Sequence, residues 1–109
     1  MYDFSSYDNV PWKPYNSQIK AVVVEEGVTS VGDCAFWNYY GDTNITSISL
    51  PSTLKKIGIH GLSHLSIEEL VIPSGVESIG IEAFYCCNNL TTVTIPYTVK
   101  SIDENAFAV

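Results

Sequence analysis

The chain has 109 residues, the length of one ordinary domain. Apolar residues make up 46% of it and charged residues only 16%, a balance that excludes a disordered chain and a coiled coil. Five basic against twelve acidic residues leave a net charge of −7, so the chain lacks the basic surface that nucleic acids and anionic membranes require. Its longest apolar run, residues 21–24, is far shorter than the ~20 residues of a membrane-spanning helix.

Residues 1–18 form an aromatic segment that shares no pattern with the rest of the chain. The stretch lacks the basic and apolar regions of a signal peptide. We expect it to be an N-terminal cap that covers the first unit of the repeats that follow. The alternative is an aromatic platform that binds sugars. The aromatic residues are Tyr2, Phe4, Tyr7, Trp12 and Tyr15.

Four repeated units follow, and they start at Ile19, Ile45, Ile67 and Leu90. Each begins with an apolar-x-x-apolar-x-apolar segment, continues with a second apolar-x-x-apolar segment, and ends with a small residue followed by a large one. In every unit the large residue lies 17 positions after the start, whereas successive starts are 26, 22 and 23 residues apart. All variation in length therefore falls after the small-large pair. The four pairs are Ala35-Phe36, Gly61-Leu62, Ala83-Phe84 and Ala106-Phe107.

This spacing predicts a solenoid, in which a coil of constant length buries side chains and one exposed loop absorbs insertions. A β-sandwich would need the spacing to arise by coincidence. Residues 22–24, 48–50, 70–72 and 93–95 should alternate between the inside and the outside of stacked parallel strands. The Gly that follows the second segment should mark a bend, and the small-large pair suits a short helical turn with its large side chain inside.

The third unit, from Ile67 to Cys87, resembles the BspA-like leucine-rich repeats, and weaker copies start at the other three positions. The resemblance covers residues 19–109 and implies a right-handed leucine-rich-repeat superhelix of about four units, the last one truncated. It further implies a secreted or surface-anchored bacterial protein that binds other proteins, with adhesion as its role and without catalysis or a cofactor. A structural spacer within a larger surface protein is the main alternative.

The outward positions of the first segments are small and rich in hydroxyl groups, which suits either strand propensity or a binding face. Four strands about 4.8 Å apart give an area of roughly 240 Å², against about 800 Å² per partner in a standard interface, so this face alone should bind weakly. The candidate binding residues on it are Ser47, Ser49, Glu69, Thr92 and Thr94.

The first unit carries an insertion at residues 37–44, three residues longer than its counterpart in the third unit. Its aromatic residues are of the type enriched at binding hot spots, although they could equally fold back onto the core. With the aromatic residues of the cap, they would form the site of a carbohydrate-binding module. The candidate residues here are Trp37, Tyr39, Tyr40 and Asp42.

Residues that often carry chemistry are present without a supporting pattern. His60 and His64 have the i, i+4 spacing of a helical metal pair, but no further ligand lies nearby in sequence, so we expect no metal site. Adjacent carboxylates such as Glu68 and Glu69 should point to opposite faces of a strand and not converge. Three Cys form no disulfide framework: Cys87 should be buried, Cys34 and Cys86 partly exposed, and Cys34 too many layers away to bridge to either.

The chain stops within the fourth unit, at residues 106–109, and leaves an apolar face and a strand edge without a following unit. This suggests an excised piece of a longer protein. It also predicts self-association through this end, by a two-fold contact that pairs the edge strands antiparallel.

Overall fold

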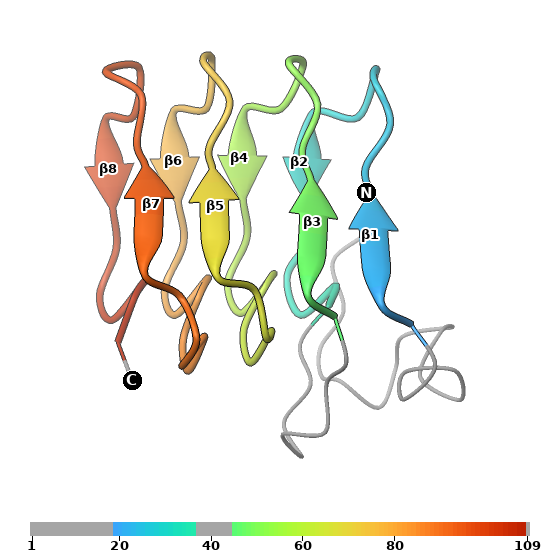
Figure 1. Ribbon diagram of the computed structural model, residues 1–109. Helices are drawn as coiled ribbons and strands as arrows, with labels where there is room; N and C mark the ends of the chain where they lie inside the picture. The colour runs from blue at the N-terminus through green and yellow to red at the C-terminus, as the bar shows by residue number, and fades with distance from the viewer. Residues whose placement is uncertain (1–18, 37–44, 109) are drawn as a thin grey trace.

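The computed structural model describes residues 19–36 and 45–108. Those residues hold short strands and no helix, and therefore no helix that could cross a membrane. The odd-numbered strands lie on one side of the molecule, here called the front face, and the even-numbered strands lie behind them in the rear sheet (Figure 1). The strands are β1 (Ala21–Val23), β2 (Ser30–Val31), β3 (Ser47–Ser49), β4 (Lys56–Ile57), β5 (Glu69–Val71), β6 (Ser78–Ile79), β7 (Thr92–Thr94) and β8 (Ser101–Ile102).

The rear sheet is continuous and entirely parallel, in the order β2-β4-β6-β8. Its register pairs Val31 with Ile57, Ile57 with Ile79, and Ile79 with Ile102. Each of these residues occupies the same position in its own repeat, so one repeat forms one coil and successive coils stack directly. The solenoid predicted from the spacing is confirmed.

The front face is not the single stack of four strands that the repeats predict. Strand β1 pairs with β3 and β5 with β7, but β3 and β5 belong to different sheets. The connection from Leu62 to Ile67 is one residue shorter than the one from Phe84 to Leu90. The second and third coils instead meet lower down, where the Ser66 amide donates a 2.9 Å hydrogen bond to the Ile45 carbonyl. Figure 1 shows the resulting gap between β3 and β5.

The inward positions of all four coils form one hydrophobic cluster. In the third coil Leu70, Ile72 and Ile79 are buried, and the intervening Val71 is exposed, as the predicted alternation requires. Phe84 is 1% exposed and Leu62 is completely buried, so the large residue of the small-large pair fills the interior. In the fourth coil Ile95 and Ile102 are exposed, because only one neighbouring coil covers them in the described chain.

The turns that carry the small-large pairs are not helical, and this expectation was wrong. In the second coil the Gly61 amide donates to the Gly58 carbonyl at 3.0 Å, and the residue before Gly61 has a positive φ. A left-handed residue ends a right-handed helix after one turn, so each unit makes a tight turn of the type II kind instead. The left-handed residues at this position are Cys34, His60, Glu82 and Asn105, with φ between 53° and 59°.

The glycines at the end of the second segments are the first residues of these turns, as their position predicted, but close packing rather than a positive φ requires a glycine there. Neither Gly58 nor Gly80 has a positive φ. A Cβ atom on Gly80 would lie 2.9 Å from the carbonyl carbon of Gly58 and 3.0 Å from the amide nitrogen of Ile59. Backbone of one coil thus rests directly on backbone of the next, which leaves no room for a side chain.

Candidate functional site

The five front-face residues proposed from the sequence are all exposed, as expected. The register pairs Val23 with Ser49 and Val71 with Thr94, and these two pairs, at the last positions of the four front strands, are here called the front row. Val23 and Val71 are 70% and 68% exposed, far more than apolar side chains in a solenoid core. The front row therefore exposes both apolar and hydroxyl groups. A binding role for these residues stays a prediction.

The interruption between β3 and β5 hollows the front face into a groove that runs along both strands. Its lower part has a volume of about 500 Å³ and its upper part about 330 Å³, and the two parts share Ile48 and Glu69. We call this the front groove. The lower part is also lined by Thr46, Ser47, Ser66, Glu68 and Asn89, and the upper part by Ser49, Leu50, Val71 and Pro73.

Glu68 and Glu69 both line the lower part of the front groove. The sequence had predicted that neighbouring carboxylates would point to opposite faces of a strand. That prediction was wrong here because β5 begins only at Glu69, so Glu68 lies ahead of the regular alternation. Of the predicted residues, the groove brings together Ser47, Ser49 and Glu69; sequence analysis missed Thr46, Ser66 and Asn89 as lining residues. The shorter connection after Leu62 was the feature of the sequence that could have indicated a break between the second and third front strands.

Trp37, Tyr39, Tyr40 and Asp42, like the aromatic segment 1–18, lie outside the described residues.

A hydrolytic triad would have the composition of Ser63, His60 and Glu82, but the contacts of these residues stabilise the turns of two neighbouring coils. The Nε2 atom of His60 lies 3.2 Å from Oε2 of Glu82, and the Ser63 hydroxyl oxygen lies 3.4 Å from Nδ1 of His60. Ser63 is completely buried, and its hydroxyl group donates a hydrogen bond to the Glu82 carbonyl. A nucleophile must be accessible to substrate and pass its proton to the base, and this hydroxyl does neither. The three residues join the second coil to the third.

No group of three or more His, Cys, Asp or Glu side chains in residues 19–36 and 45–108 is arranged to hold a metal ion. His64 instead contacts Tyr85, with ring centroids 5.7 Å apart and the planes at 71°. Burial, together with the nearby His60, lowers the pKa of His64 below its usual 6.5. The folded protein therefore favours the neutral ring.

The His64 pKa predicts how stability changes with pH. The unfolded chain takes up the proton more readily, so the free energy of unfolding should be constant above about pH 6.5 and fall as the pH decreases from there through the lower pKa of the folded state. Urea denaturation at pH 7.5 and 5.5 measures the fall, and it should be smaller in His64→Gln. The pKa of the Glu26 carboxylate is lowered from 4.5, mainly by the Ser52 amide. Its contribution to the free energy of unfolding is therefore lost only at a pH more acidic than the range compared here. An equal fall in both proteins would contradict the prediction.

Cys34 lies in the first coil and Cys86 and Cys87 lie in the third, and all three are free thiols. Cys87 is buried as predicted, and its sulfur donates to the Leu62 carbonyl in the second coil at 3.4 Å. Cys34 is also buried, at 6% exposure, which corrects the expectation that it is partly exposed; Cys86 is partly exposed as expected. Burial raises the pKa of Cys87 to about 11, so its unreactive thiol form dominates at neutral pH.

Alkylation should therefore distinguish the three thiols. At pH 8 we expect iodoacetamide to modify Cys86 first, and Cys34 and Cys87 only after denaturant is added, because the reagent needs an accessible thiolate. Mass spectrometry of the digested protein over time reads the order directly. Cys86→Ser should remove the fast phase. A rate for Cys87 comparable to that of Cys86 would show that the third coil opens in the native state.

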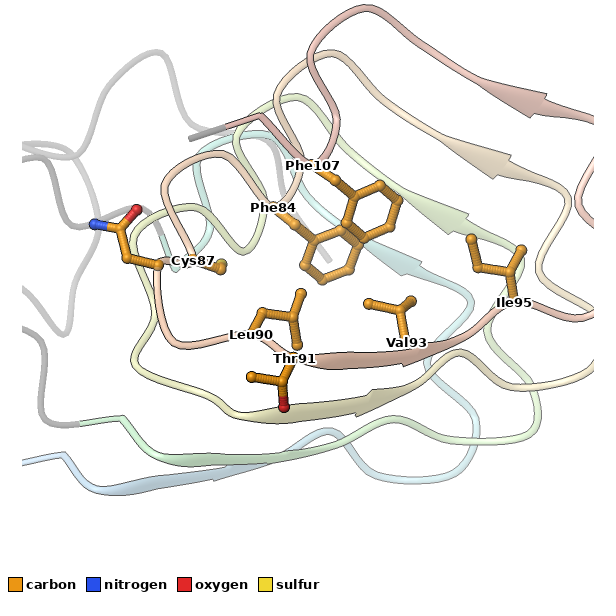
Figure 2. A pocket seen from close by; sticks show the side chains of 8 residues that line it. Phe84, Cys87, Leu90, Thr91, Val93, Ile95 and Phe107 are labelled. Atoms are coloured by element: carbon orange, nitrogen blue, oxygen red, sulfur yellow. The ribbon is translucent and has the colours of Figure 1, made fainter.

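The end of the fourth coil carries an apolar pocket of about 300 Å³. Figure 2 shows the rings of Phe84 and Phe107 stacked beside it, and their centroids are 5.1 Å apart. Leu90, Val93 and Ile95 also line the pocket. Leu90, Val93, Ile95 and Phe107 belong to the open end of the fourth unit through which self-association was predicted, together with Val99 and Ile102, and that contact stays a prediction.

The sequence matches the family described as "BspA type Leucine rich repeat region (6 copies)" over residues 15–109. The chain belongs to this BspA-type leucine-rich repeat family. No curated protein matches it. A solved structure of a leucine rich cell surface protein from Faecalibacterium prausnitzii A2-165 is similar, with a TM-score of 0.69 and 27% identity. That similarity covers 81% of this chain and 22% of the other.

A leucine-rich repeat protein from Eubacterium ventriosum ATCC 27560 shares the fold, with a TM-score of 0.68 and 22% identity over 93% of this chain and 32% of its own. This BspA-type chain thus spans about a fifth of the first of these solved bacterial proteins and about a third of the second. The family agrees with the resemblance of the third unit to BspA-like repeats.

Proposed function

We propose that this BspA-type repeat region is a non-enzymatic protein-interaction module of a secreted or cell-surface bacterial protein, with adhesion as its role. The observation that carries the proposal is the front row, in which two valines about 70% exposed are each paired with a hydroxyl residue, Ser49 or Thr94. Exposed apolar groups with polar neighbours are a feature of contact surfaces. The similarity to a protein described as a leucine rich cell surface protein supports the location.

The front row is too small for a standard interface by itself, so the module should bind weakly alone and more tightly when further coils extend the surface. This expectation fits a chain that spans 22% of one solved relative. A spacer would show no partner at all.

The test is binding of the immobilised chain to a panel of purified extracellular proteins, followed by biolayer interferometry. We expect saturable binding that Val71→Lys abolishes and that Ser101→Lys, a change at an exposed position of the rear sheet, leaves intact. Binding that both variants weaken equally, or no binding at all, would favour the spacer. Binding to a glycan array that is lost in Trp37→Ala and Tyr40→Ala would favour the carbohydrate-binding module instead.

A further inference from the structure

We propose that the front groove receives an arginine side chain of the partner protein, with its aliphatic part on Ile48 and its guanidinium group between Glu68 and Glu69. This inference rests on the proposed function, because it names the chemistry of the partner that the front face would contact. It depends on three independent features of the groove: its width, its division into an apolar and a polar part, and its charge.

The contacts between the second and third coils limit the width of the groove, so that it has no place for an additional strand. The second and third coils remain joined behind the groove, where Lys56 and Ile57 pair with Ser78 and Ile79. They also remain joined below it, through the 2.9 Å hydrogen bond from Ser66 to Ile45. An inserted strand would need about 4.8 Å on each side and would have to break these contacts. The separation is therefore confined to the front strands.

The lining of the groove changes character along the strands. The upper part is lined mainly by the apolar residues Leu50, Val71 and Pro73, with Ser49 and Glu69 beside them, and Ile48 continues the apolar lining into the lower part. The lower part ends in two carboxylates, hydroxyl groups and the Asn89 amide. A long side chain with an apolar stem and a polar head matches this order, since arginine and lysine bury their methylene groups and keep the charge at a polar end.

The charge of the groove selects the head group. Ser47, Ser66, Glu68 and Glu69 supply mostly hydrogen-bond acceptors, and in the described part of the chain neither carboxylate forms an ion pair. Among the residues that the structure describes, no basic residue lines the groove, and the chain as a whole carries a charge of −7. The guanidinium group offers five donors in a planar fork, so it can bond both carboxylates at once, whereas an ammonium group acts as a point charge.

The test uses a short probe, acetyl-Gly-Leu-Arg-Gly-amide, titrated into ¹⁵N-labelled protein at low salt. We expect shifts of the amide signals of Ser47, Ile48, Glu69 and Asn89. Replacing one carboxylate, as in Glu69→Gln, should weaken binding about 3- to 5-fold, and the double variant with Glu68→Gln about tenfold, as for exposed ion pairs. The same peptide with citrulline, which keeps the shape and removes the charge, should lose binding similarly.

The matched control is Glu77→Gln, an exposed carboxylate that precedes β6 on the rear sheet, and it should bind the arginine peptide as the parent does. Equal binding of the citrulline peptide, no effect of Glu69→Gln, or an equal effect of Glu77→Gln would overturn the proposal. The outcome is separable from that of the proposed function. A protein partner that is lost with Val71→Lys and kept with Glu69→Gln would preserve the interaction module and reject the arginine site.

Discussion

Phe84→Ala should lower the free energy of unfolding by about 3–5 kcal/mol, the largest effect that we expect from a single substitution. The ring is 1% exposed and is stacked against Phe107 at 5.1 Å, nearly parallel, in the closed interior of the third coil. Coils on both sides hold the backbone in place, since the Phe84 amide donates to the Ala106 carbonyl and the Leu62 amide to the Ala83 carbonyl. The cavity can therefore collapse only partly. A loss of this size is a large fraction of the 5–15 kcal/mol typical of a domain.

Urea denaturation measures the Phe84→Ala effect, and an unchanged m-value would show that the unfolding transition still exposes the same surface. Phe107→Ala is the matched control and should cost less, because Phe107 is partly exposed at the end of the fourth coil. Leu62→Phe should also be tolerated better than Phe84→Ala, since overpacking of a core costs about 1–3 kcal/mol. A Phe84→Ala protein within about 1 kcal/mol of the parent would contradict the inward placement of the small-large pair.

Gly80→Ala should lower the free energy of unfolding by about 1–3 kcal/mol, although it adds a single methyl group. The new Cβ atom would meet only backbone: the carbonyl carbon of Gly58 at 2.9 Å, the Ile59 nitrogen at 3.0 Å and the Ile57 oxygen at 3.1 Å. No side chain can rotate away to relieve this contact. The second and third coils must separate, which lengthens the 2.8 Å hydrogen bond from the Gly80 amide to the Ile57 carbonyl.

Thermal or urea unfolding of Gly80→Ala checks this expectation, with Ser78→Ala as the control. Ser78 lies two residues earlier on the rear sheet and should change stability by no more than about 0.5 kcal/mol. Hydrogen exchange of the Gly80 amide gives a second readout, because a lengthened bond should exchange faster. Equal stability of the two variants would mean that the coils are more loosely stacked than the contact distances indicate.

The sequence by itself determined the coil. An apolar residue that recurs at the same place in each unit falls at the same height in each layer, so the 17-residue span was enough to predict parallel stacking and the burial of Leu70, Ile79 and Phe84. The exposed positions of Ser49 and Thr94 followed from the same alternation. These features are properties of one repeat and its nearest copies, which is why they could be predicted from the pattern alone.

Only the tertiary structure decided how neighbouring coils meet, because that depends on the path of the backbone rather than on the order of apolar residues. A connection shorter by one residue joins Ser66 to Ile45 and leaves β3 and β5 unpaired, and the front groove with Glu68 and Glu69 follows from that break. The left-handed turn residues gave no common signal, since His60 and Asn105 are of types enriched at positive φ whereas Cys34 and Glu82 are not. Their conformation is imposed by the contacts between stacked coils.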